Sequence, residues 1–369
     1  MSNNSKRERF RAACRFEKTD RFAHMEHGFW DETYDVFLEQ GLDKSVVRPE
    51  FYGWQKNDLF EHFDCLKPGY IRPDTYMNPP IETVILNETD EYRDIRNGNG
   101  TVLRQSKTGA SLPMELSHEI KDKKSYMEYR DRLTNVDFKM RWGGVEESIA
   151  AYERAGDYAL LCTHMDGFFA YPRELLGVVE TLYMYYDDPE FMHLLYDDRV
   201  DFYMKLYEPI LKRVKLDFAF IWEDMCFKNG PLVSPDVFRE FMLPAYKKLT
   251  QYLRDFGVEN IIVDSDGDVT KLIPLWLEGG VTGLLPFEVQ SGMDVVKLGE
   301  MFPTLQIVGG LNKLKMFASK QEIDEELDRV LPAMAKRGGY IPSLDHWVPP
   351  EIGLENFTYY CEKLHSFRI

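Results

Sequence analysis

Acidic side chains follow several short apolar runs in this chain, and carboxylates in that position can act as acids, bases or metal ligands. Asp264, Asp266 and Asp268 follow one run, and Glu223 and Asp224 follow another. Like charges that share a cavity raise its free energy unless a proton, a metal or a cation compensates them. Convergence of these groups would therefore indicate a functional site. Polar residues in the same position after other runs are His24, Glu26, His27, His164, Asp166, Cys226, Glu288, Gln290, Asn312, Asp345 and His346.

A structural role is the competing interpretation for any single one of these side chains. Asp and Asn also cap the helices that follow strands. Asp268 is the clearest candidate for a cap, because a helical pattern begins at Val269. His164 could equally satisfy a backbone group, and Cys226 could be an inert buried thiol. The set as a whole is therefore stronger evidence for a site than any one member.

The apolar runs alternate with amphipathic segments, which is typical of βα units around a parallel sheet. The clearest helix begins with Ser234 as its N-cap and Pro235 at its first position, and Gly257 ends it. Longer helices are expected over 172–186 and 189–212. The extended runs are 22–25, 158–163, 218–222, 260–263, 283–287, 305–308 and 339–341.

These patterns predict a single (β/α)8 barrel domain over residues 1–369, since barrels commonly exceed the usual domain length. In such a barrel, the residues that follow the strands gather at one mouth. The extended runs 82–86 and 101–104 flank the Asn97-Gly98 step. Asn-Gly between extended runs is a hairpin signal. We therefore predict a β-hairpin near residues 82–106, inserted in the barrel.

The charge and composition of the chain exclude several classes of binding partner and location. A net charge of −17 repels phosphate backbones and anionic lipids, so nucleic acid and membrane surfaces are poor candidates. No apolar run approaches the roughly 18 residues that span a bilayer. The beginning of the chain does not resemble a secretory signal. The five cysteines are scattered without a CxxC motif, which indicates free thiols in a reducing compartment. We expect a soluble cytoplasmic enzyme.

Several stretches of the chain resemble the uroporphyrinogen decarboxylase superfamily. They are EDMCFKNGPLVSP (223–235), IIVDSDG (261–267), VGGLN (308–312) and GGYIP (338–342), with RERFRAA (7–13), TDR (19–21) and DDPEF (187–191). The resemblance is collinear and covers nearly the whole chain. It implies a single (β/α)8 barrel that is either a decarboxylase or a methyltransferase serving corrinoid proteins, and relatives imply a homodimer.

Departures from the decarboxylase weaken that interpretation. The family's decarboxylase carries two arginines at the first strand, which hold the carboxylates of its substrate, whereas AHMEHGFW (23–30) contains none. A tetracarboxylate would meet many acids here, and each close pair of like charges costs on the order of 1 kcal/mol or more. His346 does match the family's active-site histidine. Asp64 is the candidate for its second-strand aspartate.

The thiol-methylating branch departs from this chain as well. That branch binds zinc through a His-x-Cys motif and a further Cys near the last strand. At the matching positions this chain has Asp264-Ser265-Asp266 and Asp345-His346. Zinc held by thiolate and imidazole lowers the pKa of a thiol acceptor, and that ligand set is missing here.

The resemblance therefore favours a methyltransferase that moves a methyl group from a small O- or N-methyl compound to a corrinoid (cobalamin) on a partner protein. A carboxylic acid with a raised pKa, or a divalent metal such as zinc, would activate the leaving heteroatom. The predicted catalytic residues are Glu223, Asp264, Asp266 and His346, and with Asp345 they are also the predicted metal ligands. The predicted substrate- or corrinoid-binding residues are His24, Glu26, His27, Trp30, His164, Asp166, Glu288 and Trp347.

Two smaller expectations and the alternative functions remain open. Trp30, Trp222, Phe287 and Trp347 could offer aromatic faces to a cationic substrate, or could simply pack. Gly309-Gly310, with Lys313 and Lys315, could admit a phosphate or form only a tight turn. The alternative functions are a decarboxylase, of the uroporphyrinogen type or for a smaller acid, and a corrinoid- or metallophore-binding protein without chemistry.

Overall fold

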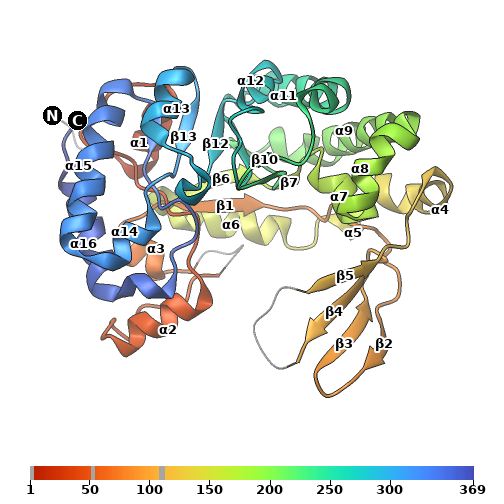
Figure 1. The fold of residues 1–369 in the computed structure, drawn as a ribbon, viewed down its shortest axis with the longest axis horizontal. Coiled ribbons are helices and arrows are strands. Elements are labelled where there is room, and N and C mark those ends of the chain that lie inside the picture. Colours follow the sequence, from red (N-terminus) through yellow and green to blue (C-terminus); the bar gives the residue numbers. More distant parts are fainter. Residues whose placement is uncertain (1–3, 51–54, 108–112) are drawn as a thin grey trace.

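The computed structural model describes residues 4–50, 55–107 and 113–369, and parallel strands surrounded by helices form its main body (Figure 1). Strand β1 (Lys67–Ile71) pairs in parallel with β6 (Ala159–Thr163) along five residues. A second parallel sheet has the order β14-β13-β12-β11-β8-β7. Its strands are β7 (Met165–Asp166), β8 (Ala219–Trp222), β11 (Ile261–Asp264), β12 (Gly283–Leu285), β13 (Gln306–Val308) and β14 (Tyr340–Ile341). The α/β class with a parallel sheet is thus confirmed.

Single bridges link these sheets to each other and to the start of the chain. A parallel bridge between Cys162 and Phe218 joins β6 to the segment that leads into β8. Met25 bridges to Leu66 in parallel, just before β1. The backbone N–H of Met25 also donates to the carbonyl of Pro342, 3.4 Å away and just after β14. The predicted first strand, 22–25, is therefore a short extended segment between two strand edges.

Side chains of the parallel strands alternate between two hydrophobic clusters. Leu160, Phe220 and Ile262 belong to a small cluster whose other members come mostly from the strands. Their neighbours Leu161 and Val263 belong to a large cluster that includes the surrounding helices. Such alternation follows from the two-residue period of a strand. It explains why these strands are apolar on both faces.

The sequence located most of these strands but not β1. Runs of Ile, Leu, Val and Phe mark β6, β8 and β11 to β13, as expected for strands buried on both faces. Residues 67–71 contain Pro68 and Gly69, which are unfavourable for strands and disguise β1. A Cβ on Gly69 would lie 2.7 Å from the carbonyl oxygen of Leu160. Close packing of the backbone therefore requires the glycine.

Two of the three helices predicted near the middle of the chain are interrupted in the structure. The helix expected over 172–186 is divided into α7 (Ala170–Leu176) and α8 (Val178–Asp187), because Gly177 between them has a φ of 91°. Helix α9 spans Pro189–Leu211, as predicted. The helix that begins after Ser234 runs through α10 (Pro235–Val237), a π-helical turn (Phe238–Met242) and α11 (Leu243–Asp255).

The remaining elements cover the strands or connect them. The other helices are α1 (Lys6–Cys14), α2 (Asp31–Glu39), α3 (Leu59–His62), α4 (Lys123–Thr134), α5 (Phe138–Arg141), α6 (Val145–Ala155), α12 (Ile273–Glu278), α13 (Val295–Met301), α14 (Lys313–Ala318), α15 (Lys320–Arg337) and α16 (Gly353–Ser366). Short 3₁₀ turns occupy Gly156–Tyr158, Val289–Ser291 and Pro350–Ile352, and β9 (Cys226–Phe227) pairs with β10 (Gly230–Pro231).

A four-stranded antiparallel sheet projects from the main body (Figure 1). Its strands, in spatial order, are β2 (Val84–Glu88), β3 (Tyr92–Arg96), β4 (Val102–Ser106) and β5 (Met114–Ser117). We predicted one hairpin between 82–86 and 101–104. In the structure β2 and β4 each pair with β3 instead, and the Asn-Gly turn connects β3 to β4. The polar sequence of β3, Tyr-Arg-Asp-Ile-Arg, hides a strand that lies near the surface.

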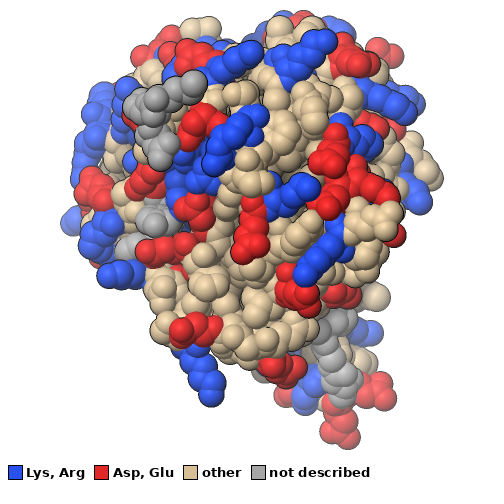
Figure 2. All heavy atoms as spheres, turned by 90° about the vertical axis from the view of Figure 1, so that its left-hand side faces the viewer, with Lys and Arg blue, Asp and Glu red and all other residues tan. Residues whose placement is uncertain are grey.

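Charged side chains of both signs are interspersed on the face that Figure 2 displays. Oppositely charged pairs between α15 and α16 are Lys320 with Glu355 at 2.7 Å and Lys363 with Asp324 at 3.0 Å. The net negative charge thus does not form one uniform patch on this face. No helix within the described ranges has both the length and the apolar character required to cross a membrane.

Candidate active site

A cavity of about 480 Å³ lies where the parallel strands end. Such a volume suits a small-molecule site. The acids among the predicted site residues that line it are Asp166, Asp264 and Asp266. The other predicted residues that line it are His27, Trp30, His164, His346 and Trp347. A neighbouring cavity of about 320 Å³ shares His27, Trp30, Tyr70 and Trp347 with it.

Two carboxylate–histidine pairs form the polar part of the cavity. His27 Nε2 lies 3.7 Å from Asp264 Oδ2, and His346 Nε2 lies 3.6 Å from Asp266 Oδ2. Asp264 is the last residue of β11, and Asp266 lies in the loop that follows. The two histidines come from the loops after the first extended segment and after β14. The ends of parallel strands thus bring together residues from distant parts of the chain.

The two neighbouring aspartates have opposite pKa shifts. Burial raises the pKa of Asp264 well above its usual value, and the charges of Asp266 and Asp224 raise it further. Burial opposes ionisation of Asp266 as well, but nearby His346 lowers the pKa of Asp266 below its usual value. Asp264 therefore holds a proton under conditions in which Asp266 is ionised. Separated titration of this kind is how two carboxyl groups acquire different catalytic roles.

Burial holds His27 and His164 of the cavity in the neutral form. Burial lowers the pKa of His27 to about 4, and the charge of His346 acts in the same direction. Burial likewise lowers the pKa of His164 to about 4, assisted by the positive charge of Arg72. A neutral imidazole has one donor and one acceptor nitrogen. Both rings can therefore orient a polar substrate without adding positive charge.

Cations and further polar groups in the cavity were not identified from the sequence. Arg72 lines it directly after β1, and Tyr70, Tyr76 and Glu174 also contribute. Position after a strand would have pointed to Arg72 if β1 had been recognised. Asp224, which the sequence did place among the acids after strands, lines the cavity as well; burial raises its pKa, although Arg173 Nη1 lies 3.3 Å away.

Glu223 was predicted to be catalytic, but the structure places it elsewhere. It is fully buried, and its carboxylate accepts backbone N–H groups of Phe168 (2.8 Å), Phe169 (2.8 Å) and Ala170 (3.1 Å), together with the hydroxyl of Tyr246. The first turn of α7 begins here. A carboxylate with these donors stabilises the helix terminus and has little capacity left for a ligand.

Three other predicted acids also stabilise loops instead of lining the cavity. Glu26 accepts hydrogen bonds from Ser343 Oγ (3.1 Å), Leu344 N (3.2 Å) and Tyr360 Oη (2.9 Å). Asp345 accepts from the backbone N–H groups of Val289 (3.0 Å) and Lys313 (3.1 Å). Glu288 accepts from Gly267 N (3.0 Å) and Ser291 Oγ (3.2 Å). His24, predicted to bind substrate, is buried, and its Nε2 lies 2.7 Å from the acceptor Glu26 Oε1. An acid after a strand can accept hydrogen bonds from nearby donors of the protein or bind a ligand, and the sequence pattern is the same in both cases. The sequence therefore did not separate these acids from those that line the cavity.

The predicted five-residue metal site is not assembled. Among the described residues, three ligand-type side chains with donor atoms within 4.8 Å of one another occur only at His24, Cys65 and Cys361. Glu223 and Asp345 are bonded to backbone groups as described above. Asp264, Asp266 and His346 share the cavity without forming such a group. Their arrangement fits proton transfer better than coordination.

Aromatic side chains surround the polar groups on one side. Trp30 is stacked on His346, with ring centroids 6.0 Å apart, and it contacts Trp347 at 4.9 Å. Trp30 is 41% exposed, so it lies at the mouth. Trp222 also lines the cavity, but Arg173 covers its ring at 4.8 Å from the centroid, and Phe287 is buried in the core. Trp30 and Trp347 are therefore better placed to meet a substrate.

The remaining sequence candidates have structural explanations. A Cβ on Gly309 would lie 2.2 Å from the carbonyl oxygen of Pro286, and one on Gly310 would lie 2.1 Å from Val295 Cγ1. Close packing thus accounts for both glycines. Asp268 accepts from the backbone N–H of Thr270 at 3.0 Å, but α12 begins only at Ile273 with Leu272 as its N-cap, so Asp268 stabilises the preceding turn and does not cap the helix. Asp64 pairs with Lys6 at 2.5 Å and Arg21 at 2.7 Å and does not line the cavity.

Comparisons with known proteins identify similar sequences and a similar fold. Two curated relatives, the uroporphyrinogen decarboxylases of Geobacter metallireducens and Geobacter sulfurreducens, are 30% and 29% identical over 136 residues. Each match spans 37% of this chain and only 39% of the relative. A solved structure, titled methyltransferase from Methanosarcina mazei, shares the fold with a TM-score of 0.64 at 16% identity, covering 98% of this chain and 99% of that one.

A family model described as uroporphyrinogen decarboxylase (URO-D) matches residues 131–367. This match includes the carboxyl ends of β6, β8, β11 and β14, which contribute His164, Asp224, Asp264 and His346. It covers well over half of the sequence. The chain therefore belongs to the uroporphyrinogen decarboxylase family, as its motifs indicated.

Proposed function

We propose that this protein is a methyltransferase that transfers the methyl group of a small O- or N-methyl compound to a corrinoid carried by a partner protein. The observation that carries the proposal is the pair of adjacent aspartates with opposite pKa shifts, Asp264 and Asp266, in a cavity of about 480 Å³. Removal of a methyl group from oxygen or nitrogen leaves a basic heteroatom, which needs a proton. A buried, protonated carboxyl group can supply that proton.

In this mechanism Asp264 is the general acid. The C–O or C–N bond breaks, its electron pair goes to the heteroatom, and the heteroatom takes the proton of Asp264. The reduced corrinoid is the methyl acceptor and provides the electron pair of the new bond to carbon. Asp266 remains ionised and keeps the pKa of Asp264 high. His27, 3.7 Å from Asp264, is neutral and can orient the leaving atom.

A divalent metal such as zinc could polarise the heteroatom in place of the acid. Its ligands in the cavity would be Asp264, Asp266 and His346, because Glu223 and Asp345 are bonded elsewhere. The donor atoms of these three residues are not all within 4.8 Å of one another, whereas those of His24, Cys65 and Cys361 are. The proposed proton transfer therefore uses Asp264 itself.

We also propose that the parallel strands form one (β/α)8 barrel domain spanning residues 1–369, with the antiparallel sheet as an insertion. Three observations support closure. The Met25–Leu66 and Cys162–Phe218 bridges extend the strand order, and Met25 bonds to the chain after β14. Alternate strand side chains share a small cluster of their own. Active sites of such barrels lie at the carboxyl ends of the strands, where the cavity is.

Decarboxylation of a carboxylic acid is the second candidate, and Arg72 favours it. A guanidinium group in the cavity could hold a carboxylate of the substrate. After carbon dioxide leaves, the carbanion would take the proton of Asp264. The curated relatives are named as decarboxylases, although each match spans about two-fifths of their length.

An assay with reduced cobalamin as methyl acceptor tests the proposal. Purified protein is mixed with reduced cobalamin and, separately, with phenyl methyl ethers and methylamines. We expect the absorption spectrum of methylcobalamin to appear with at least one donor. Asp264→Asn should slow its formation by about 10²-fold or more. The control Asp201→Asn alters only an exposed ion pair with Lys248 and should behave as the native protein does.

Two results would contradict the methyltransferase proposal. One is an unchanged spectrum with every donor. The other is release of carbon dioxide from a carboxylic acid without cobalamin, which would establish the second candidate.

A further inference from the structure

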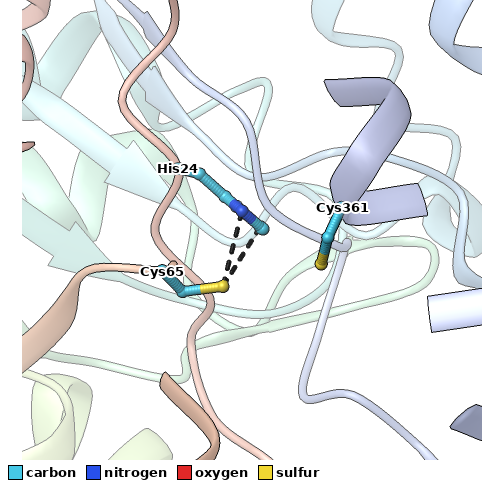
Figure 3. Close-up of side chains that lie close together, drawn as sticks. All are labelled: His24, Cys65 and Cys361. Carbon is cyan, nitrogen blue, oxygen red and sulfur yellow. Dashed lines mark hydrogen bonds between the residues drawn. The ribbon is translucent and has the colours of Figure 1, made fainter. Parts of the chain in front are cut away.

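We propose that His24, Cys65 and Cys361 form a buried zinc-binding site that is separate from the cavity and stabilises the fold. Figure 3 shows the three side chains converging from three segments of the chain. His24 precedes the bridge residue Met25, Cys65 follows α3, and Cys361 lies in α16. None of the three lines either of the two cavities at the strand ends.

The distances between donor atoms are close to what a zinc ion requires. Tetrahedral ligands at about 2.3 Å for sulfur and 2.0 Å for nitrogen lie roughly 3.5 Å apart. Cys65 Sγ is 3.4 Å from His24 Nδ1, and the donor atoms of all three residues lie within 4.8 Å of one another. A small contraction would therefore complete the geometry.

The second nitrogen of His24 is already held as it is in many zinc sites. His24 Nε2 lies 2.7 Å from Glu26 Oε1, and Tyr360 donates to the same carboxylate oxygen at 2.9 Å. A carboxylate that accepts Nε2–H fixes the tautomer and leaves the Nδ1 lone pair for a metal. Nδ1 is the nitrogen that faces Cys65 more closely, at 3.4 Å against 3.7 Å for Nε2.

A fourth ligand is available from the same helix as Cys361. His365 Nε2 lies 2.9 Å from His24 Nδ1. Without a metal these two nitrogens share one hydrogen bond, and Cys65 donates to the carbonyl of Phe63 at 3.6 Å. With zinc bound, the proton on Nε2 of His365 would shift to Nδ1 of the same ring, and Nε2 would bind the ion in place of that hydrogen bond. The ligand set would then be Cys2His2, which is typical of structural zinc.

Chemistry and burial together point to zinc and to a structural role. Thiolate and imidazole ligands select zinc or other soft ions over magnesium or calcium. His24, Cys65 and Cys361 are all buried, so a substrate has no access to the ion. The site would connect the first extended segment and the loop before β1 to the last helix. Binding energy at such a site is also folding energy.

Metal binding is expected to be coupled to proton release. Zinc replaces the S–H protons of Cys65 and Cys361, so up to two protons leave for each ion bound. No electrons are transferred in this exchange. The competing possibility is a disulfide between the two cysteines, which would require an oxidant and would exclude zinc.

Cobalt and zinc titrations of the purified full-length protein test the site. After treatment with a chelator, the protein should bind one equivalent of Co²⁺ and show thiolate-to-cobalt charge-transfer absorption, and Zn²⁺ should abolish that absorption. The midpoint of thermal unfolding should rise with zinc. Cys361→Ser should lose the absorption. The matched control Cys162→Ser should keep it, because Cys162 is buried in β6 and contacts the carbonyl of Gly69.

A second measurement needs no variant and does not depend on methyl transfer. Zinc should slow alkylation of Cys65 and Cys361 in the native protein, and mass spectrometry of the peptides can compare them with Cys162. Three outcomes would overturn the site: no cobalt absorption in the native protein, equal absorption in Cys361→Ser, or a Cys65–Cys361 disulfide in the freshly purified chain.

Discussion

At the scale of single residues, Asp264 combines a catalytic advantage with a cost in stability. Its folded-state pKa is raised by burial and by neighbouring acids. The protonated form is therefore favoured by folding, so stability is complete at low pH and is lost as the pH rises through the raised pKa. Buried groups that oppose folding are common at functional sites. The same property makes Asp264 an acid and weakens the fold.

Asp264→Asn should therefore raise the free energy of unfolding at pH 8 by about 1 kcal/mol, while leaving it nearly unchanged at pH 4. The amide has a similar shape and no charge, so it removes the penalty of ionisation. Urea unfolding at the two pH values measures this difference. Lower stability of the variant at both pH values would show that Asp264 is a structural acid.

His27 has a pH dependence of the opposite kind. Its pKa falls from 6.5 to about 4 on folding, because burial and His346 disfavour the charged ring. The unfolded chain therefore binds a proton first, and stability falls as the pH is lowered from about 6.5 toward 4. Between pH 7 and pH 5 this one group should contribute up to about 2 kcal/mol of the loss.

His27→Gln should reduce that loss of stability by a corresponding amount. Chemical denaturation of the native and variant proteins at pH 7 and pH 5 gives the comparison. His62→Gln is a control, because His62 lies outside both cavities at the strand ends. Equal losses in native protein and His27→Gln would mean that His27 is not buried as a neutral ring.

At the scale of elements, the ends of the strands hold two kinds of acid. Asp264 and Asp266 face the cavity, whereas Glu223 stabilises the start of α7. The sequence locates both kinds correctly after strands, because apolar runs and turn residues mark the strand ends. It does not distinguish them, because the backbone donors that satisfy Glu223 lie more than 50 residues away at Phe168 and Phe169. Only the folded arrangement brings these groups together.

Glu223→Gln should therefore destabilise the protein by about 1–3 kcal/mol, since an amide group would face backbone donors with donors of its own. Urea unfolding measures the effect. Glu278→Gln is the matched control, because Glu278 forms exposed ion pairs with Lys247 and Arg239 and should leave stability nearly unchanged. Native stability together with a large loss of activity would restore Glu223 as a catalytic residue.

The strength of the local apolar pattern determines which strands and helices can be located from the sequence. Buried strands such as β11 and long helices such as α9 were located because their apolar patterns are strong. β1 was missed because Pro68 and Gly69 interrupt its pattern, and Arg72 was missed with it. The His24–Cys65–Cys361 cluster was not found either. Cys65 lies 41 residues after His24, and Cys361 lies 296 residues after Cys65, so no local sequence motif marks the cluster.

At the scale of the whole molecule, the cavity at the strand ends and the His24–Cys65–Cys361 cluster are two separate sites. The cavity collects loops that follow β1, β6, β8, β11 and β14. The His24 cluster joins the first extended segment, the loop before β1 and α16, and its three residues line neither of the two cavities at the strand ends. Loss of zinc would affect stability, whereas loss of Asp264 would affect the reaction. The two proposals can therefore fail independently.

The transfer of a labelled methyl carbon tests the central claim most directly. A donor that supports cobalamin methylation is supplied with a ¹³C-methyl group, and the carbon is followed by NMR with native protein, Asp264→Asn and Asp201→Asn. We predict that the label moves to cobalamin with the native protein and Asp201→Asn, and about 10²-fold or more slowly with Asp264→Asn. Transfer at an equal rate with Asp264→Asn, or no transfer with the native protein, would contradict the assignment of Asp264 as the acid of a methyltransferase.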